Sequence, residues 1–405
     1  MQSNPGRISR GRGLFALLGR LIAIAALLQA STGSAADDDR LIRVEVSTQT
    51  HDAFHPWQTT TPGTQSGYGF QIDDVHILTT ERLVRNHTLV EIQRPRSADK
   101  VTVKVLMSDY RLNLALLRMP SLPTISPLEM IGIEENIQLG DQLEILQMDD
   151  VRDLQSGAVR VQQIRVGRLP DSPNSLLEYS LLCSLNVNGG GAPVMKNGQL
   201  VGVTISFDPR SRIATMVSAP FVKRFIEDAL TPPYRGIASA GFTWKALVDP
   251  VTRRFLKLDI PSDGILVLSA LPGTGAKGVL ESMDVILEWD GHPVDSLGFY
   301  EDHTLGRTDF SHLIKAHRHP GDLVKLLVLR DGKRTELELT LGGNLDESVL
   351  VPENVTATRA EYVIAGGFVL RELDMHYLRS YGPKWRAKVD SRLLNTYLSE
   401  RKGER

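Results

Sequence analysis

A glycine-rich loop that runs directly into a tight hairpin constrains the fold of this 405-residue chain more than any other stretch. The loop is Asn188-Gly189-Gly190-Gly191-Ala192-Pro193, and a short β-prone run at 181–185 precedes it. Residues 194–203 then flank Asn197-Gly198 with apolar segments, and this dipeptide favours the two-residue turn of a β-hairpin. A strand, a glycine loop and a hairpin in this order predict an antiparallel β structure.

Short β-prone segments occupy most of the region between residues 41 and 233. They are rich in Val, Ile and Thr, and turn signals separate them: 41–48, 67–72, 76–80, 101–107, 114–119, 142–146 and 157–166. One helix is predicted after Pro220, because an apolar stripe at helical spacing follows it and Pro232-Pro233 ends it. Many short strands with one helix predict a mostly β fold, either a sandwich or a barrel.

Three segments of this region resemble serine proteases of the HtrA/Deg type. The segments are the loop at 186–193, the strand at 67–70 with residues 77–84, and residues 109–117. The resemblance implies a chymotrypsin-like double β-barrel over residues 37–233. It places Arg82 where the family has its histidine base, Asn113 where it has the aspartate, and Gly190 where it has the nucleophilic serine.

The residues at these three positions lack the chemistry of acyl transfer. Glycine has no side chain to attack a carbonyl, arginine stays protonated, and asparagine carries no charge to hold an imidazolium. Loss of a triad lowers turnover by on the order of 10⁶. The sequence therefore predicts no catalytic residues, and an inactive serine endopeptidase homologue rather than an enzyme. Four neighbours that could substitute are expected to have structural or surface roles: His76, His87, Cys183 and Ser184.

Two function classes stay open. The first is an exported pseudoprotease that binds or scaffolds other proteins, and the second is an active HtrA/Deg-type serine endopeptidase in periplasmic protein quality control. The chain has no Gly-x-Ser-Gly-Gly stretch, which favours the first. Arg82 would then either make the old cleft cationic, or extend into solvent or pair with Glu81 or Asp109.

Residues 235–343 resemble the PDZ domain of the same family. The run 236–242 corresponds to its carboxylate-binding loop and first groove strand, and 283–294 follow its G-D-V-I pattern. A PDZ domain adds a peptide end to a strand edge and holds the carboxylate with backbone N–H groups. The resemblance therefore implies protein or peptide C-termini as partners, bound by Ser239, Ala240, Gly241 and Phe242.

The C-terminal residues 357–405 resemble part of a second PDZ-like domain. Residues 361–373 repeat the loop-and-strand pattern. The chain stops at Arg405, too early to complete that fold, so we expect either a curtailed domain or a fragment.

The first 36 residues have the pattern of an export signal. A basic start precedes an apolar core at 21–28, and Ser34-Ala35-Ala36 offers a cleavage site. Export to the periplasm is expected, with no membrane span in the mature chain, because no later run of 18 apolar residues occurs. A net charge of −2 gives no argument for a nucleic-acid partner, and the single cysteine excludes an intrachain disulfide.

No cofactor and no metal site are expected. His317 and His319 have a spacing that can bind zinc, and His312 is near in sequence, but no acidic or cysteine partner stands at ligand spacing. We therefore expect these histidines at a solvated helix end. The resemblance to HtrA proteases further implies a homotrimer assembled through the barrel domains.

Overall fold

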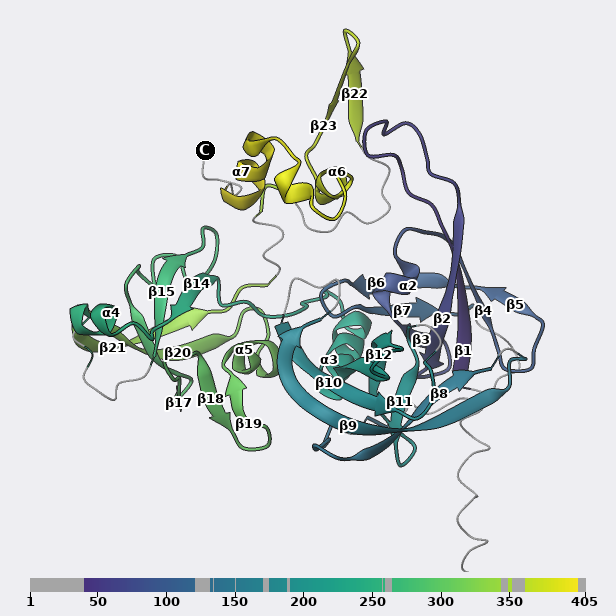
Figure 1. Ribbon diagram of the computed structural model, residues 1–405, viewed down its shortest axis with the longest axis horizontal. Coiled ribbons are helices and arrows are strands. Elements are labelled where there is room, and N and C mark those ends of the chain that lie inside the picture. The colour runs from purple at the N-terminus through teal and green to yellow at the C-terminus, as the bar shows by residue number, and fades with distance from the viewer. Residues whose placement is uncertain are drawn as a thin grey trace, which may run out of the picture.

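A computed structural model describes residues 40–120, 132–133, 135–149, 151–169, 175–187, 190–256, 258, 264–343, 349–351 and 361–399. The export signal expected at 1–36 lies outside these residues. The described chain is mostly β, as predicted. Figure 1 shows two β-rich bodies side by side, with a small C-terminal module of helices and a hairpin beyond them. No helix among the described residues is both long and apolar enough to cross a membrane.

The first body begins with a seven-stranded antiparallel sheet, ordered β5-β4-β1-β2-β3-β7-β6. Its strands are β1 (Leu41–Thr48), β2 (Gly63–Gln71), β3 (His76–Thr79), β4 (His87–Gln93), β5 (Lys100–Thr102), β6 (Lys104–Asp109) and β7 (Leu114–Arg118). Alternate residues of β1, namely Ile42, Val44 and Val46, are fully buried in one core. The short helix α2 (Glu81–Val84) follows β3 and reverses the chain into β4.

A closed six-stranded barrel completes the first body, ordered β10-β13-β12-β11-β8-β9. Its strands are β8 (Gln142–Met148), β9 (Leu154–Arg168), β10 (Ser175–Cys183), β11 (Pro193–Lys196), β12 (Gln199–Asp208) and β13 (Ile213–Ser218). The predicted hairpin is present, with Asn197 and Gly198 at φ 52° and 78° between β11 and β12. The predicted helix is α3 (Ala219–Leu230), whose apolar stripe packs into the barrel core.

The second body is a twisted sheet ordered β14-β15-β16-β20-β21, with β17 added to β16. Its strands are β14 (Phe242–Ala246), β15 (Ile265–Ala270), β16 (Val285–Trp289), β17 (His292–Pro293), β20 (Leu323–Arg330) and β21 (Lys333–Thr340). The helices α4 (Pro250–Phe255) and α5 (Ser311–His317) and the hairpin of β18 (Phe299–Asp302) and β19 (Gly306–Asp309) complete it. Trp289 and Phe310 are buried at its centre.

Helix α5 joins the two bodies, because it lies against β10 of the barrel (Figure 1). The Nζ of Lys315 on α5 donates to the backbone oxygen of Ser175, at 2.8 Å. Arg224 on α3 donates to the backbone oxygens of Lys315 and Gly236, both at 2.8 Å. These bonds cross the boundary in both directions and hold the second sheet against the barrel.

The C-terminal module contains β22 (Tyr362–Ala365), β23 (Phe368–Arg371), α6 (Met375–Arg379), the 3₁₀ turn η2 (Trp385–Ala387) and α7 (Ser391–Ser399). The segment after β1 reaches up to it (Figure 1). There the backbone oxygen of Ala53 accepts a bond from Arg371 at 2.8 Å, and the Phe54 ring lies 5.5 Å from the rings of Tyr377 and Tyr381. The module therefore contacts the protease-like body through a segment distant in sequence.

Candidate functional site

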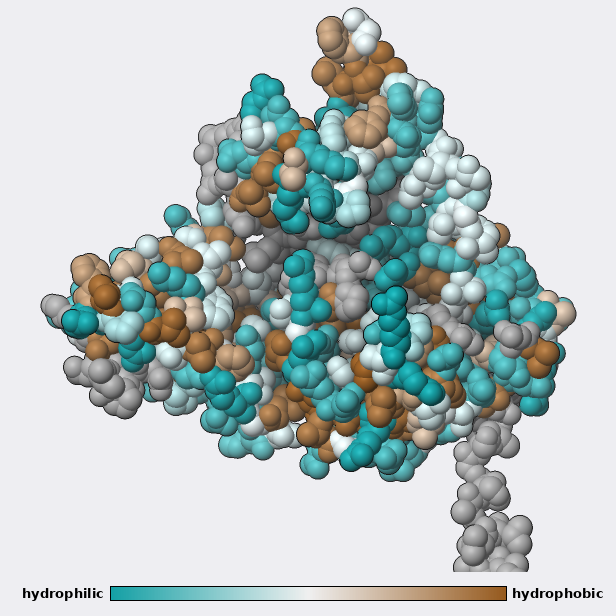
Figure 2. Space-filling model, in the orientation of Figure 1, coloured by the Kyte–Doolittle hydropathy of each residue, from teal (hydrophilic) through white to brown (hydrophobic). Residues whose placement is uncertain are grey.

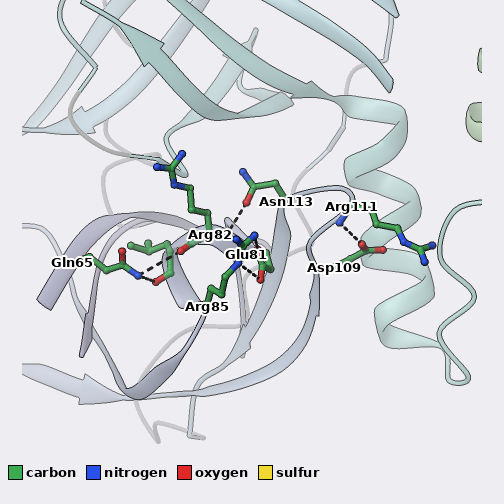
Figure 3. Close-up of polar contacts among 8 residues, drawn as sticks. Gln65, Glu81, Arg82, Arg85, Asp109, Arg111 and Asn113 are labelled. Atoms are coloured by element: carbon green, nitrogen blue, oxygen red, sulfur yellow. Dashed lines mark hydrogen bonds and ion pairs between the residues drawn. The ribbon is translucent and has the colours of Figure 1, made fainter. Parts of the chain in front are cut away.

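The residues expected at the triad positions come together where the seven-stranded sheet meets the barrel. Arg82 is on α2, and Asn113 lies in the turn between β6 and β7. The side-chain oxygen of Asn113 accepts the backbone N–H of Arg82 at 2.9 Å (Figure 3). Asn113 is buried and has φ 53°, a left-handed conformation that asparagine tolerates. The Asn113 side chain therefore holds the first turn of α2 in place through the backbone N–H of Arg82.

The two carboxylates near Arg82 are bound by other groups. Glu81 is buried and accepts from Arg85, with Nε at 2.9 Å and Nη2 at 2.6 Å. Asp109 accepts the hydroxyl of Tyr234 at 2.5 Å and the backbone N–H of Arg111 at 2.8 Å. Burial and the charge of Asp109 raise the pKa of Tyr234, so its hydroxyl stays a donor. The Arg82 side chain itself is exposed, and Figure 3 shows its guanidinium directed away from both carboxylates.

Gly190 and Gly191 fix the loop against β2. The backbone oxygen of Gly190 accepts the N–H of Tyr68 at 2.9 Å. A Cβ on Gly191 would lie 2.0 Å from the backbone oxygen of Tyr68, and its φ is 88°, so this position admits glycine alone. A Cβ on Gly190 would lie 3.4 Å from the hydroxyl of Thr80, which is an ordinary contact. The loop therefore has room for a side chain at position 190 and for none at 191.

This geometry limits what the three positions can do. Gly190 supplies no nucleophile, and Arg82 supplies no base, because a guanidinium does not lose its proton in proteins. Asn188 and Gly189, which precede Gly190, lie outside the described residues. The chemistry of peptide hydrolysis cannot be assigned to the side chains at 82, 113 and 190.

The neighbouring residues considered as substitutes have other contacts. The His76 ring lies 2.7 Å from the Asp73 carboxylate in a local turn, and the exposed His87 ring bonds a backbone oxygen at 2.8 Å. Cys183 is buried, and burial raises the pKa of its thiol. Ser184 lies on the exposed segment that leaves β10. These contacts support structural and surface roles for all four.

The loop predicted to bind a carboxylate is held by backbone hydrogen bonds before it enters β14. Ser239 exchanges two backbone hydrogen bonds of 2.9 Å with Gly342. Gly241 has φ 73°, and its backbone oxygen accepts the N–H of Leu271 at 2.8 Å. A Cβ on Gly241 would lie 2.4 Å from the side chain of Thr274. Position 241 therefore requires glycine for both conformation and space.

The strand that follows this loop is the terminal strand of its sheet. Within the described sheet, β14 pairs along one edge with β15. Phe242 stacks on Trp289 at 6.2 Å, and the Trp244 ring lies 5.3 Å from Phe310, which directly precedes α5. The rings of Phe242 and Trp244 thus belong to an aromatic cluster that leads into α5. A terminal strand is what strand addition requires.

The second loop-and-strand pattern forms a hairpin. Gly366 and Gly367 have φ 56° and 81° and make the two-residue turn between β22 and β23. Most side chains of the hairpin are exposed and apolar, and they gather at the top of Figure 2: Val363, Ile364, Phe368, Val369 and Leu370. The C-terminal module therefore presents a projecting apolar hairpin.

One group of neighbouring side chains was not predicted from the sequence. Asp302, His312 and His317 each place one potential ligand atom within 4.8 Å of the others. The expectation that these histidines have no acidic partner is wrong, because the hairpin β18–β19 folds Asp302 back onto α5. Sequence spacing gave no signal, since the carboxylate comes from a different element.

Comparison with known proteins relates most of the chain to proteins named as proteases. A sequence model of the PDZ domain matches residues 351–405. Over 353 residues, the chain is 26% identical to "Putative protease Do-like 11, mitochondrial" of Arabidopsis thaliana, covering 84% of this chain and 60% of that protein. Over 293 residues it is 24% identical to a "Probable periplasmic serine endoprotease DegP-like" of Pseudomonas putida, covering 70% and 57%. The chain thus spans less than two thirds of the length of these relatives.

Solved structures agree on the fold. The HtrA-type protease AlgW with a decapeptide matches with a TM-score of 0.59 and 15% identity, over 77% of this chain and 98% of that one. AlgW with a tripeptide matches with a TM-score of 0.57 and 17% identity, over 76% and 94%. At this identity the likeness establishes a shared fold.

These comparisons contradict the expectation that the chain is an inactive homologue rather than an enzyme. The relatives are named as proteases, and the structural neighbours are HtrA-type proteases. The expectation rested on the side chains at positions 82, 113 and 190 and on the missing Gly-x-Ser-Gly-Gly stretch, whereas the likeness extends over most of the chain.

Proposed function

Since this chain belongs to the HtrA/Do-like serine protease family and carries a PDZ domain, we propose that it captures polypeptide segments through its PDZ-type region at 235–343. The ends of unfolded or processed proteins are the proposed ligands. The loop Ser239-Ala240-Gly241-Phe242 would receive the terminal carboxylate.

The observation that carries this proposal is the terminal position of β14 directly after the glycine-dependent loop. A peptide can pair its backbone with the second edge of β14, while its carboxylate meets the backbone N–H groups around Gly241. The aromatic rings of Phe242 and Trp244 lie partly buried beside that edge. Apolar side chains of the peptide would contact this cluster, and Ala240 leaves more room at the terminal position than a leucine would.

The names of the relatives favour a second candidate function, endopeptidase activity on the captured polypeptide. In this proposal the second sheet, held to the barrel by α5, would deliver a segment to the cleft around Gly190. The hydrolytic groups would have to be other than the side chains of Arg82, Asn113 and Gly190. Covalent labelling of the chain would identify these groups.

Compartment and assembly are proposed on separate grounds. The leader-like pattern at 1–36 and the periplasmic name of the Pseudomonas relative support export to the periplasm, although the Arabidopsis relative has a mitochondrial name. A homotrimer is proposed only from the resemblance to HtrA proteases, which implies assembly through the barrel domains. A monomeric mass in light scattering would contradict it.

A paired binding experiment tests the main proposal. Peptides with a free C-terminus and the same peptides with an amidated C-terminus are titrated into the full mature chain. We expect amidation to weaken binding by at least about tenfold, since it removes the carboxylate. Equal affinity for both sets would mean that the loop at 239–242 is not the carboxylate site.

The same preparation tests the second candidate. Casein turnover that a serine-directed phosphonate abolishes would establish serine endopeptidase activity, and the labelled residue would identify the nucleophile. Absence of turnover in a preparation that binds peptides would leave capture as the function.

A further inference from the structure

A cavity of about 560 Å³ lies between the barrel and the second sheet. Leu177 and Tyr179 of β10 and Lys223 of α3 line its barrel side. Five histidines line it as well: His292, His303, His312, His317 and His319. This concentration is notable because the whole chain contains 10 histidines.

Two of these histidines converge with a carboxylate. His312 and His317 lie on α5 with ring centroids 5.1 Å apart, and one potential ligand atom from each lies within 4.8 Å of one from Asp302. His312 is 5% exposed, and among the described residues its Nδ1 has no hydrogen-bond partner. A buried ring nitrogen without a partner needs an explanation, and a bound ligand atom supplies one.

The carboxylate is oriented by three hydrogen bonds. Asp302 Oδ1 accepts the backbone N–H groups of Thr304 and Leu305, both at 2.9 Å. Its Oδ2 accepts the hydroxyl of Tyr300 at 2.8 Å. Each carboxylate oxygen has two lone pairs, so Oδ2 retains one for a further partner. Partners of this kind orient ligands around metal ions.

The protonation states suit cation binding at neutral pH. Burial lowers the pKa of His312 to about 4, with His317 adding to the effect. Burial also lowers the pKa of His317, against the charge of Asp302. For Asp302, burial acts to raise the pKa, but the N–H groups of Leu305 and Thr304 prevail and lower it. Two neutral imidazoles and one carboxylate are thus available together.

We propose that Asp302, His312 and His317 form a binding site for a divalent transition metal ion, Zn²⁺ in the first place. Two imidazoles and one carboxylate are a ligand set that zinc accepts, with a fourth position left for water or another group. His292 lines the same cavity, and its ring packs on Tyr300 at 5.6 Å, the residue whose hydroxyl bonds Asp302.

A metal ion at this site would also act on the boundary between the two β-rich bodies. Its ligands come from β18 and α5, and α5 is the helix that contacts β10 of the barrel. The Lys315 bond to Ser175 lies between the two histidines in sequence. A bound ion would fix the hairpin β18–β19 on α5 and so stiffen the boundary between the two bodies.

The test uses Zn²⁺ itself with the full mature chain, purified without a histidine tag. Competition with a chromophoric chelator measures stoichiometry and affinity. We expect one equivalent of Zn²⁺ per chain, and an affinity at least tenfold weaker in Asp302→Asn and in His317→Ala. His303→Ala is the matched control, because His303 lines the same cavity and is exposed, like His317, but lies outside the group. It should change affinity by less than twofold.

Two further measurements keep the proposal falsifiable. Zn²⁺ should raise the melting temperature of the unmodified chain and of His303→Ala, and leave that of His317→Ala unchanged. Co²⁺ should give ligand-field absorption that disappears in Asp302→Asn, a change that leaves the side-chain volume intact. Absence of stoichiometric binding, or equal losses in His303→Ala and His317→Ala, would overturn the proposal.

Discussion

The region around Gly190 and the cavity around His312 differ in how sequence motif and side-chain chemistry are combined. In the first region the backbone contacts are close: Asn113 binds the N–H of Arg82, and Gly191 lies tightly against Tyr68. The side chains of a Ser-His-Asp triad are absent from positions 82, 113 and 190. At the cavity no motif exists in the sequence, yet an aspartate and two histidines converge.

The comparison shows that a sequence motif and a set of ligating side chains can occur at different places in one chain. A motif is a spacing of residue types within one segment, and packing can hold its backbone in place whatever side chains it carries. A ligand set needs only atoms that meet in space, and separate elements can supply them. Four predictions follow this contrast, from the largest expected effect to the smallest.

Restoring the triad should have the largest effect, and the effect is on the rate of hydrolysis. The combined change Arg82→His, Asn113→Asp and Gly190→Ser supplies a base, a carboxylate and a nucleophile, and Gly190 has room for the serine Cβ. We expect casein hydrolysis about 10³-fold faster than in the unmodified chain. The control keeps Gly190 while changing the other two positions, and it should show no gain. Equal rates in all three proteins would show that hydrolysis uses other groups.

The backbone of the loop is tested by a pair of alanine variants. Gly191→Ala forces a Cβ to 2.0 Å from the Tyr68 oxygen at φ 88°, whereas Gly190→Ala meets only an ordinary contact. We expect Gly191→Ala to lower the free energy of unfolding by about 3 kcal/mol. Gly190→Ala should cost less than about 1 kcal/mol. Denaturant unfolding measures both, and similar losses would contradict the difference between the two positions.

Peptide capture is tested at Gly241. Gly241→Val places a β-branched side chain against Thr274 at φ 73°, which should distort the carboxylate loop. Affinity for a C-terminal peptide should fall by about tenfold, or 1.4 kcal/mol. Gly273→Val is the matched control, since Gly273 has φ 71° with nothing within 4 Å.

Arg82→Ala is compared with Gly241→Val in the same peptide-binding experiment. It should weaken peptide binding less than Gly241→Val does, since the side chain is exposed and far from the loop in sequence. If Arg82→Ala abolished binding while Gly241→Val kept it, the ligand site would be the protease-like cleft.

The smallest expected effect concerns another place where distant segments meet. Phe54 contacts Tyr377 and Tyr381 edge to face, both at 5.5 Å. Phe54→Ala should loosen the C-terminal module by about 1 kcal/mol. Hydrogen exchange of α6 measures this, with Trp57→Ala as the control, since Trp57 contacts Tyr362 instead. Faster exchange in both variants alike would indicate a general loss of stability.

Much of the fold could be predicted from the sequence, because its signals are local. Asn197-Gly198 gave the hairpin of β11 and β12, and the stripe after Pro220 gave α3. The structure brings positions 82, 113 and 190 into one region, whereas their assignment as triad positions stays a prediction.

By itself the sequence indicated many of the strands, the hairpin turn at Asn197-Gly198, and that position 190 has no side chain to offer. Only the tertiary structure decided that Asp302 lies beside His312 and His317, and that Asn113 binds the backbone of Arg82 rather than its side chain. The physical reason is that periodicity and turn preference act over a few residues. Convergence of ligand atoms depends instead on how whole elements pack, and no spacing along the chain records that.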